Sequence, residues 1–137
     1  MNSTSGSLDM QILVYAIVLG LVQLLLSVSL NVARRGLHYG VGPRDDVPKP
    51  LGKIASRIER AWKNFIETFP FFAASILLAH ALNKSTPNSV LGAQIYIWSR
   101  VLYVPFYIFG IPWLRTMSWV ASVAGIVLGL AAIWPST

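Results

Sequence analysis

The sequence contains no cysteine, and its only histidines are His38 and His80. A chain without cysteine forms no disulfide, no thiolate nucleophile and no cysteine metal site. Two histidines far apart in the sequence do not supply the ligand set of a zinc site, so we expect no bound metal. Any thiol chemistry must therefore use a thiol that a substrate brings.

Charged residues are also scarce. They make up 12% of the 137 residues, whereas 55% of the residues are hydrophobic, and the mean hydropathy is +0.60. A soluble domain carries about twice that charged fraction. The length allows one domain, residues 1–137, and the composition predicts an all-α, multi-pass integral membrane protein.

Acidic residues are the rarest charged groups, with 5 Asp and Glu against 11 Lys and Arg, for a net charge of +6. A basic excess by itself suggests nucleic acid, but most of these cations lie between Arg34 and Lys63, beside apolar segments. In that position they are typical of topology signals and of contacts with lipids or anions, so we predict no nucleic-acid partner. The positive-inside rule then places both termini on the non-cytoplasmic side.

Four apolar segments are each long enough to cross a bilayer as a helix. The predicted spans cover about residues 10–33, 57–83, 87–110 and 117–134. The last span carries small residues, among them Gly125 and Gly129, that allow close helix packing. Between the first two spans, the density of glycine and proline in residues 36–55 predicts a structured loop without a helix.

Two helix starts have recognisable signals. Ser56, followed three residues later by Glu59, fits a capping box, so we predict that the second helix begins near Ser56. Thr86 followed by Pro87 is typical of an N-cap with proline at the first helical position, which predicts the start of the third helix.

Three polar residues, Arg60, Asn64 and Glu67, enter the second apolar segment. Their spacing of four and three residues places them on one face of a helix. Glu67 lies ten residues after Arg57, so at about 1.5 Å per residue its carboxylate lies roughly 15 Å along the helix. Charged groups at such a depth usually face a polar cavity or a partner, which makes this face a candidate functional site.

The third apolar segment carries Arg100, Tyr103 and Tyr107, again on one helical face. Because this segment runs back toward the same end, Arg100 should lie about as deep as Glu67, and we predict a contact between the two. Guanidinium groups bind carboxylates and a carboxylate binds an ammonium group, so the funnel suits a small zwitterion with excess negative charge. Its rim would consist of Arg34, Arg35 and Arg115.

Each of these groups also has an interpretation without a ligand. Glu67 and Arg100 would serve as an ion pair that fixes the register of two helices. Tyr103 and Tyr107 would pack or anchor a helix at the membrane interface, and the rim arginines would act only as topology signals. These alternatives stay open at the level of the residues.

The combined pattern resembles the MAPEG superfamily, the membrane-associated proteins in eicosanoid and glutathione metabolism. The resemblance rests on R-x-x-x-N-x-x-E-x-x-P from Arg60 to Pro70, followed by R-x-x-Y-x-x-x-Y from Arg100 to Tyr107. The end of the first span, N-V-A-R-R, is similar to the same place in the leukotriene C4 synthase and microsomal glutathione transferase branch. The resemblance covers about residues 31–119, and it implies a four-helix protomer assembled as a homotrimer.

The resemblance also implies that glutathione binds as a co-substrate at subunit interfaces, near the cytoplasmic face. Arg115 corresponds to the arginine that activates the thiol and is the implied catalytic residue. Arg34 would reach in from a neighbouring subunit. The expected glutathione-binding residues are Arg34, Arg60, Asn64, Glu67, Arg100, Tyr103 and Tyr107.

The function that follows is conjugation of glutathione to hydrophobic electrophiles, or reduction of lipid hydroperoxides with it. The expected partners are membrane lipids and a hydrophobic or lipid substrate. The rival hypothesis is a non-enzymatic lipid-binding or adaptor protein of the same superfamily. A small transporter is a third class, but the polar groups form one offset cluster and do not continue through the first and last spans.

Overall fold

The computed structural model describes residues 3–135 of the chain. Within those residues it contains four long helices and one short helix. They are α1 (Ser3–Arg35), α2 (Leu37–Val41), α3 (Lys53–Ala81), α4 (Pro87–Phe109) and α5 (Pro112–Ile133).

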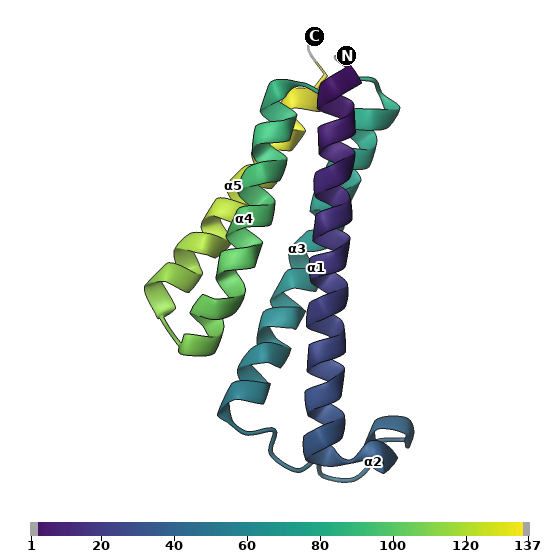
Figure 1. The fold of residues 1–137 in the computed structure, drawn as a ribbon, viewed down its shortest axis with the longest axis vertical. Coiled ribbons are helices and arrows are strands. Elements are labelled where there is room, and N and C mark those ends of the chain that lie inside the picture. Colours follow the sequence, from purple (N-terminus) through teal and green to yellow (C-terminus); the bar gives the residue numbers. More distant parts are fainter. Residues whose placement is uncertain (1–2, 136–137) are drawn as a thin grey trace.

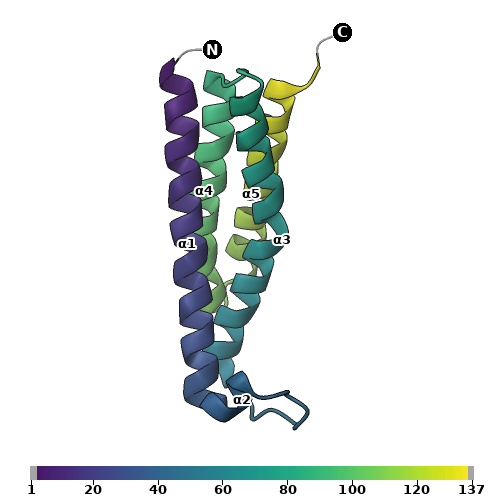
Figure 2. The same ribbon diagram turned by 90° about the vertical axis from the view of Figure 1, so that its right-hand side faces the viewer.

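The long helices run up and down, so both ends of the chain lie at the same end of the bundle (Figure 1). The short helix α2 and the loop after it lie at the opposite end, where α1 ends and α3 begins (Figures 1 and 2). The α4–α5 hairpin is shorter than the α1–α3 pair, and its turn lies part-way along α3 (Figure 1). The lower part of α1 and α3 therefore extends beyond the hairpin.

Three helices are long and apolar enough to cross a membrane, in segments Thr4–Arg35, Lys53–Ala81 and Pro112–Ile133. Large apolar side chains such as Val14, Val18 and Leu25 point outward from α1 and are more than half exposed, as expected for a surface that faces lipid. These features confirm the predicted all-helical membrane class. The helix predicted as the third span, α4, is 23 residues long but carries the polar residues of the candidate site and is not among these three.

The apolar core lies in the half of the bundle near the chain ends. It is built from Ile12 and Ala16 of α1, together with residues of α3, α4 and α5. At its centre the rings of Phe72 and Tyr96 stack with centroids 4.0 Å apart. The charged residues of α3 and α4, from Arg60 to Glu67 and at Arg100, lie nearer the α4–α5 turn, below the core.

The predicted start of α4 is confirmed. The Thr86 hydroxyl accepts a hydrogen bond from the Ser89 backbone N–H at 3.2 Å, and the Ser89 hydroxyl accepts one from the Thr86 N–H at 3.0 Å. The prediction of a capping box at Ser56 was wrong, because α3 begins one turn earlier, at Lys53, after Gly52 with φ +81°. Ser56 lies inside the first turn and donates to the Lys53 carbonyl at 3.1 Å.

Three other boundaries differ from the sequence prediction. Residues 36–55 do contain a helix, since α2 forms between Gly36, at φ +87°, and Gly42. The helix α1 extends beyond the predicted 10–33 at both ends, and α5 begins at Pro112, before the predicted residue 117. The predicted bounds followed the uncharged stretches, whereas helical hydrogen bonding continues into the polar flanks.

The helices α4 and α5 approach most closely at two glycines. A Cβ on Gly92 would lie 2.5 Å from the Gly125 carbonyl oxygen, and a Cβ on Gly125 would lie 2.5 Å from the Gly92 oxygen. The backbones are therefore in direct contact, as the small residues of the last span predicted. This contact fixes the position of α5 against α4.

Candidate functional site

The centre of the polar cluster is Arg100, which is only 1% exposed. Its Nη1 donates to Asn64 Oδ1 and its Nη2 donates to Thr68 Oγ1, both at 2.7 Å. The guanidinium carbon lies 5.3 Å from the ring centroid of Tyr103 and 5.7 Å from that of Tyr96. The buried cation is thus held by two neutral oxygens and two aromatic rings.

The predicted contact between Glu67 and Arg100 was wrong. In the described part of the chain no ion pair joins them, and Glu67 is exposed. Asn64 lies between the two, since its Nδ2 faces Glu67 Oε2 at 3.5 Å while its Oδ1 accepts from Arg100. Arg100 does lie level with this part of α3, but it inserts along the ridge of Asn64 and Thr68, which are one turn apart, and Glu67 points to the side.

Toward the α4–α5 turn the cluster continues through Tyr107. Its hydroxyl accepts a hydrogen bond from Arg60 Nε at 3.1 Å, and the guanidinium carbon of Arg115 lies 4.8 Å from its ring centroid. The rings of Tyr103 and Tyr107 are 5.5 Å apart, centroid to centroid. A continuous set of contacts therefore joins the α3 residues, the α4 residues and Arg115 of α5.

Two concave regions adjoin this cluster and share Trp119. We call the first the polar pocket, of about 160 Å³, lined by Asn64, Tyr103, Arg115, Thr116 and Trp119. The second is the α3–α5 groove, of about 340 Å³, lined by Glu67, Thr68, Phe71, Trp119, Val123, Ile126, Val127 and Leu130. A cationic compartment and an apolar compartment thus meet at one indole ring.

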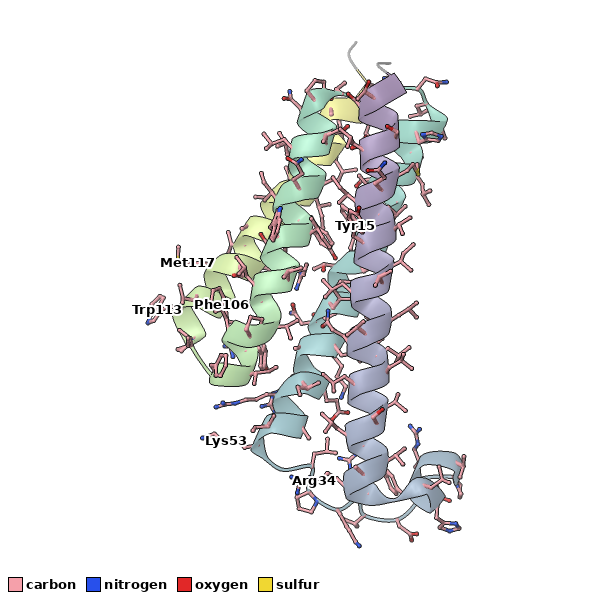
Figure 3. All side chains as sticks on the ribbon, viewed as in Figure 1. Tyr15, Arg34, Lys53, Phe106, Trp113 and Met117 are labelled. Atoms are coloured by element: carbon pink, nitrogen blue, oxygen red, sulfur yellow. The ribbon has the colours of Figure 1, made fainter. Side chains whose placement is uncertain are left out.

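The structure does not bring Arg34 or Arg35 to this cluster within the protomer. Figure 3 places Arg34 near the lower end of α1, below the α4–α5 turn marked by Phe106 and Trp113. The guanidinium of Arg35 instead contacts Asn31 and the Lys49 carbonyl, both at 3.1 Å. Of the predicted rim, only Arg115 lies at the polar pocket.

Sequence reasoning missed Thr68, Tyr96 and Trp119. Thr68 lies four residues after Asn64 and so belongs to the same face, a signal that the spacing already contained. Tyr96 lies four residues before Arg100 and extends the polar face of α4, whereas Trp119 lies in an uncharged apolar segment that carries no such signal. We call Tyr96, Arg100, Tyr103 and Tyr107 the α4 stripe.

The charges of the cluster suit an anion that also carries an ammonium group. The guanidinium groups of Arg60 and Arg115 both lie against the ring of Tyr107, and that of Arg100 lies against the ring of Tyr103. The carboxylate of Glu67 lies beside Asn64 in the same cluster. Arg100 is buried and engaged, whereas Arg60 is exposed and Arg115 is half-buried. The last two therefore have donors available for a ligand, as does the exposed Glu67 for a cation.

The sequence matches the model of the MAPEG family over residues 12–134, nearly the whole chain. A comparison with curated proteins gave no match. The matched range includes every residue of the polar pocket, the α3–α5 groove and the α4 stripe. Together with the helical membrane fold, this match shows that the chain belongs to the MAPEG family.

Proposed function

We propose that the protein is a membrane-bound, glutathione-dependent transferase or peroxidase that acts on hydrophobic electrophiles or lipid hydroperoxides. The observation that carries the proposal is the junction at Trp119, where the polar pocket meets the α3–α5 groove. A thiol peptide and an apolar acceptor need such adjoining compartments. Family membership supports glutathione as the thiol.

The cluster offers a partner for each charged group of glutathione. Its two carboxylates match the guanidinium groups of Arg60 and of Arg34 from a neighbouring protomer, because guanidinium groups bind carboxylates through two parallel hydrogen bonds. Its ammonium group matches the exposed carboxylate of Glu67, and its amides match Asn64 and the hydroxyl of Tyr107. Arg100 acts from beneath by fixing Asn64 through their 2.7 Å hydrogen bond.

In this proposal Arg115 holds the thiol as a thiolate. A guanidinium beside a thiol lowers the pKa of the thiol, and the thiolate is the nucleophile. The sulfur then attacks the electrophilic carbon of an acceptor in the α3–α5 groove. The new C–S bond forms as the bond to the leaving oxygen or halide breaks, and the thiol proton passes to water. Holding both reactants at the junction supplies much of the rate.

We further propose that α4 is a fourth span and that the protein works as a homotrimer. The helix α4 packs against α5 through the glycine contact and has 23 residues against 22 in α5, so it should cross wherever α5 crosses. The polar pocket, about 160 Å³, is smaller than the roughly 300 Å³ at which small-molecule sites begin. A neighbouring protomer, bringing its own Arg34, would complete the site, and both termini would lie on the non-cytoplasmic side.

The oligomer is the first expectation to test. Protein extracted in a mild detergent is expected to give a trimer as the main species in native mass spectrometry, because the family resemblance implies a homotrimer with its sites between protomers. The matched measurement is glutathione binding at rising detergent concentration. The amount of glutathione bound should fall as the trimer separates. A monomer that keeps full glutathione affinity would contradict the interfacial site.

A second prediction concerns Glu67. The Glu67→Gln variant is expected to bind glutathione at least about tenfold more weakly, because a hydrogen bond to a charged group contributes about 1.5–3 kcal/mol. Isothermal calorimetry in detergent measures the affinity. Glu59→Gln is the matched control, since Glu59 belongs to the same helix and pairs with Lys63 at 3.3 Å, away from the polar pocket. Equal affinity in the two variants would remove Glu67 from the site.

The second candidate function is non-enzymatic binding of a lipid in the α3–α5 groove. It is favoured by the size of the groove, about 340 Å³, relative to the polar pocket. Purified protein tested with a panel of thiols and electrophiles separates the two. Turnover with glutathione supports the enzyme, whereas lipid binding without thiol binding in a thermal-shift titration supports the adaptor.

A further inference from the structure

A third concave region lies apart from the polar pocket and the α3–α5 groove. It has a volume of about 460 Å³, lies between the end of α1, the short helix α2 and the start of α3, and shares no lining residue with the other two. We call it the α1–α2–α3 groove. Its volume falls within the range of small-molecule sites, and neither the proposed chemistry nor the predicted site residues account for it.

One wall of the groove is apolar. Leu24, Val28 and Val32 line it at intervals of four residues along α1, and Trp62 lines it from α3. This spacing places the three aliphatic side chains on one face of the helix. Val41 of α2 continues the apolar lining and is 79% exposed. The result is an apolar trough parallel to a helix that is apolar enough to cross a membrane.

Cations line the groove at the end of the bundle where α1 stops. Arg35 and Arg44 line it there, whereas Lys63 and the carboxylate of Glu59 line it from within α3, beside Trp62. The Arg35 guanidinium is held by Asn31 and lies 5.5 Å from the Tyr39 ring centroid. Arg44 Nη2 donates to the Gly40 carbonyl at 3.2 Å.

Both arginines keep donors that these contacts do not use, because a guanidinium has five N–H groups. Lys63 pairs with Glu59, so the remaining positive charge of the groove comes from Arg35 and Arg44. The same two arginines also line a neighbouring concavity that contains Asp45 and Asp46, but among the described residues neither carboxylate forms an ion pair with them. The side chain of Arg35 is half-buried, which holds its charge at the groove. An anion with an apolar tail matches this arrangement in both charge and polarity.

We propose that the α1–α2–α3 groove binds one anionic phospholipid per protomer. Its phosphate contacts Arg35 and Arg44, and one acyl chain lies against Leu24, Val28 and Val32. Basic pockets between membrane helices bind anionic headgroups in this way. The site goes beyond the proposed function, because it shares no lining residue with the polar pocket. On α3, Trp62 and Lys63 line the groove, whereas Asn64 lines the polar pocket.

The test uses the full-length protein in a neutral detergent and native mass spectrometry. Dioleoyl phosphatidylglycerol is titrated against dioleoyl phosphatidylcholine, which has the same acyl chains and no net charge. Phosphatidylglycerol is expected to bind at least about fivefold more tightly, since one cation near an anionic headgroup contributes about that factor. Arg44→Gln is expected to weaken phosphatidylglycerol binding about fivefold.

Lys53→Gln is the matched control, because it removes one exposed cation from the same end without touching the groove. It should change the affinity less than twofold. Val41→Glu, an exposed position that tolerates a polar residue, places a second carboxylate in the groove and should also lower lipid retention. Glycerol 3-phosphate at millimolar concentration should not displace the lipid, because it lacks the acyl chain.

Three outcomes would overturn the proposal. The first is equal binding of the two lipids. The second is an equal effect of Arg44→Gln and Lys53→Gln, which would reduce the effect to overall charge. The third is loss of the oligomer in Arg44→Gln, which would show that a second copy of the chain covers the groove. None of these outcomes depends on glutathione binding, so the proposed function is tested separately.

Discussion

The Arg115→Ala variant is expected to lower kcat for glutathione conjugation by about a hundredfold or more, while changing glutathione affinity less than about fivefold. Removing one preorganised hydrogen-bond donor to the negative charge that develops in a transition state typically lowers kcat by about that factor. Arg115 is suited to this role because it is half-buried at the polar pocket. Its guanidinium is also held against Tyr107 at 4.8 Å, centroid to guanidinium carbon.

The pKa of the bound thiol gives the most direct test of the role of Arg115. Ultraviolet absorbance of bound thiolate, followed as a function of pH, should show a raised thiol pKa in Arg115→Ala and a partly restored one in Arg115→Lys. Lys53→Ala is the control, since it removes an exposed cation from the same end of the bundle. If Arg115→Ala keeps wild-type kcat and wild-type thiolate absorbance, Arg115 has no part in activating the thiol.

The register between α3 and α4 could be predicted from the sequence, because it depends on helical rise and on depth alone. Contacts follow an antiparallel order, from Arg57 Nη1 donating to the Ile108 carbonyl at 2.8 Å, through Arg60 and Tyr107, to Asn64 and Arg100. The polar residues on both helices were therefore placed at the right depth. The start of α4 was equally predictable, because an N-cap threonine followed by proline is a local pattern.

The direction of each side chain could not be predicted in the same way. Glu67 and Asn64 are three residues apart on one broad face, and a difference of about 60° around the helix decides which one meets Arg100. The sequence suggested the opposite charge as the partner, whereas packing of α4 against α3 selected two neutral oxygens, those of Asn64 and Thr68. Coulomb attraction acts over a longer range than packing, so charge alone does not fix a rotamer.

The position of Arg34 illustrates a second limit. Its place at the end of α1 was predicted, but its distance from the polar pocket depends on how far α1 and α3 extend beyond the α4–α5 hairpin (Figures 1 and 3). The helices α1 and α3 have 33 and 29 residues, against 23 in α4 and 22 in α5, and α3 begins one turn before the predicted cap.

The largest effect on stability is expected for Gly92→Ala. The new methyl group would lie 2.5 Å from the Gly125 carbonyl oxygen and 2.9 Å from the Gly129 nitrogen. Both are backbone atoms of α5, so no side chain can rotate away and the two helices must separate. Overpacking of this kind typically costs about 1–3 kcal/mol and occasionally more, and we expect the upper part of that range. Gly125→Ala should behave alike, since its Cβ meets the Gly92 oxygen at 2.5 Å.

Gly129→Ala is the matched control, because its Cβ would have Ser75 Oγ as its nearest neighbour, at an ordinary 3.7 Å. Thermal unfolding in detergent should show a clearly lower midpoint for Gly92→Ala and little change for Gly129→Ala. The substitution should also lower turnover below the unfolding temperature. Arg115 and Trp119 belong to α5 and Tyr103 to α4, so separating the two helices widens the polar pocket between them. Equal midpoints for the two variants would mean that α4 and α5 are not in backbone contact.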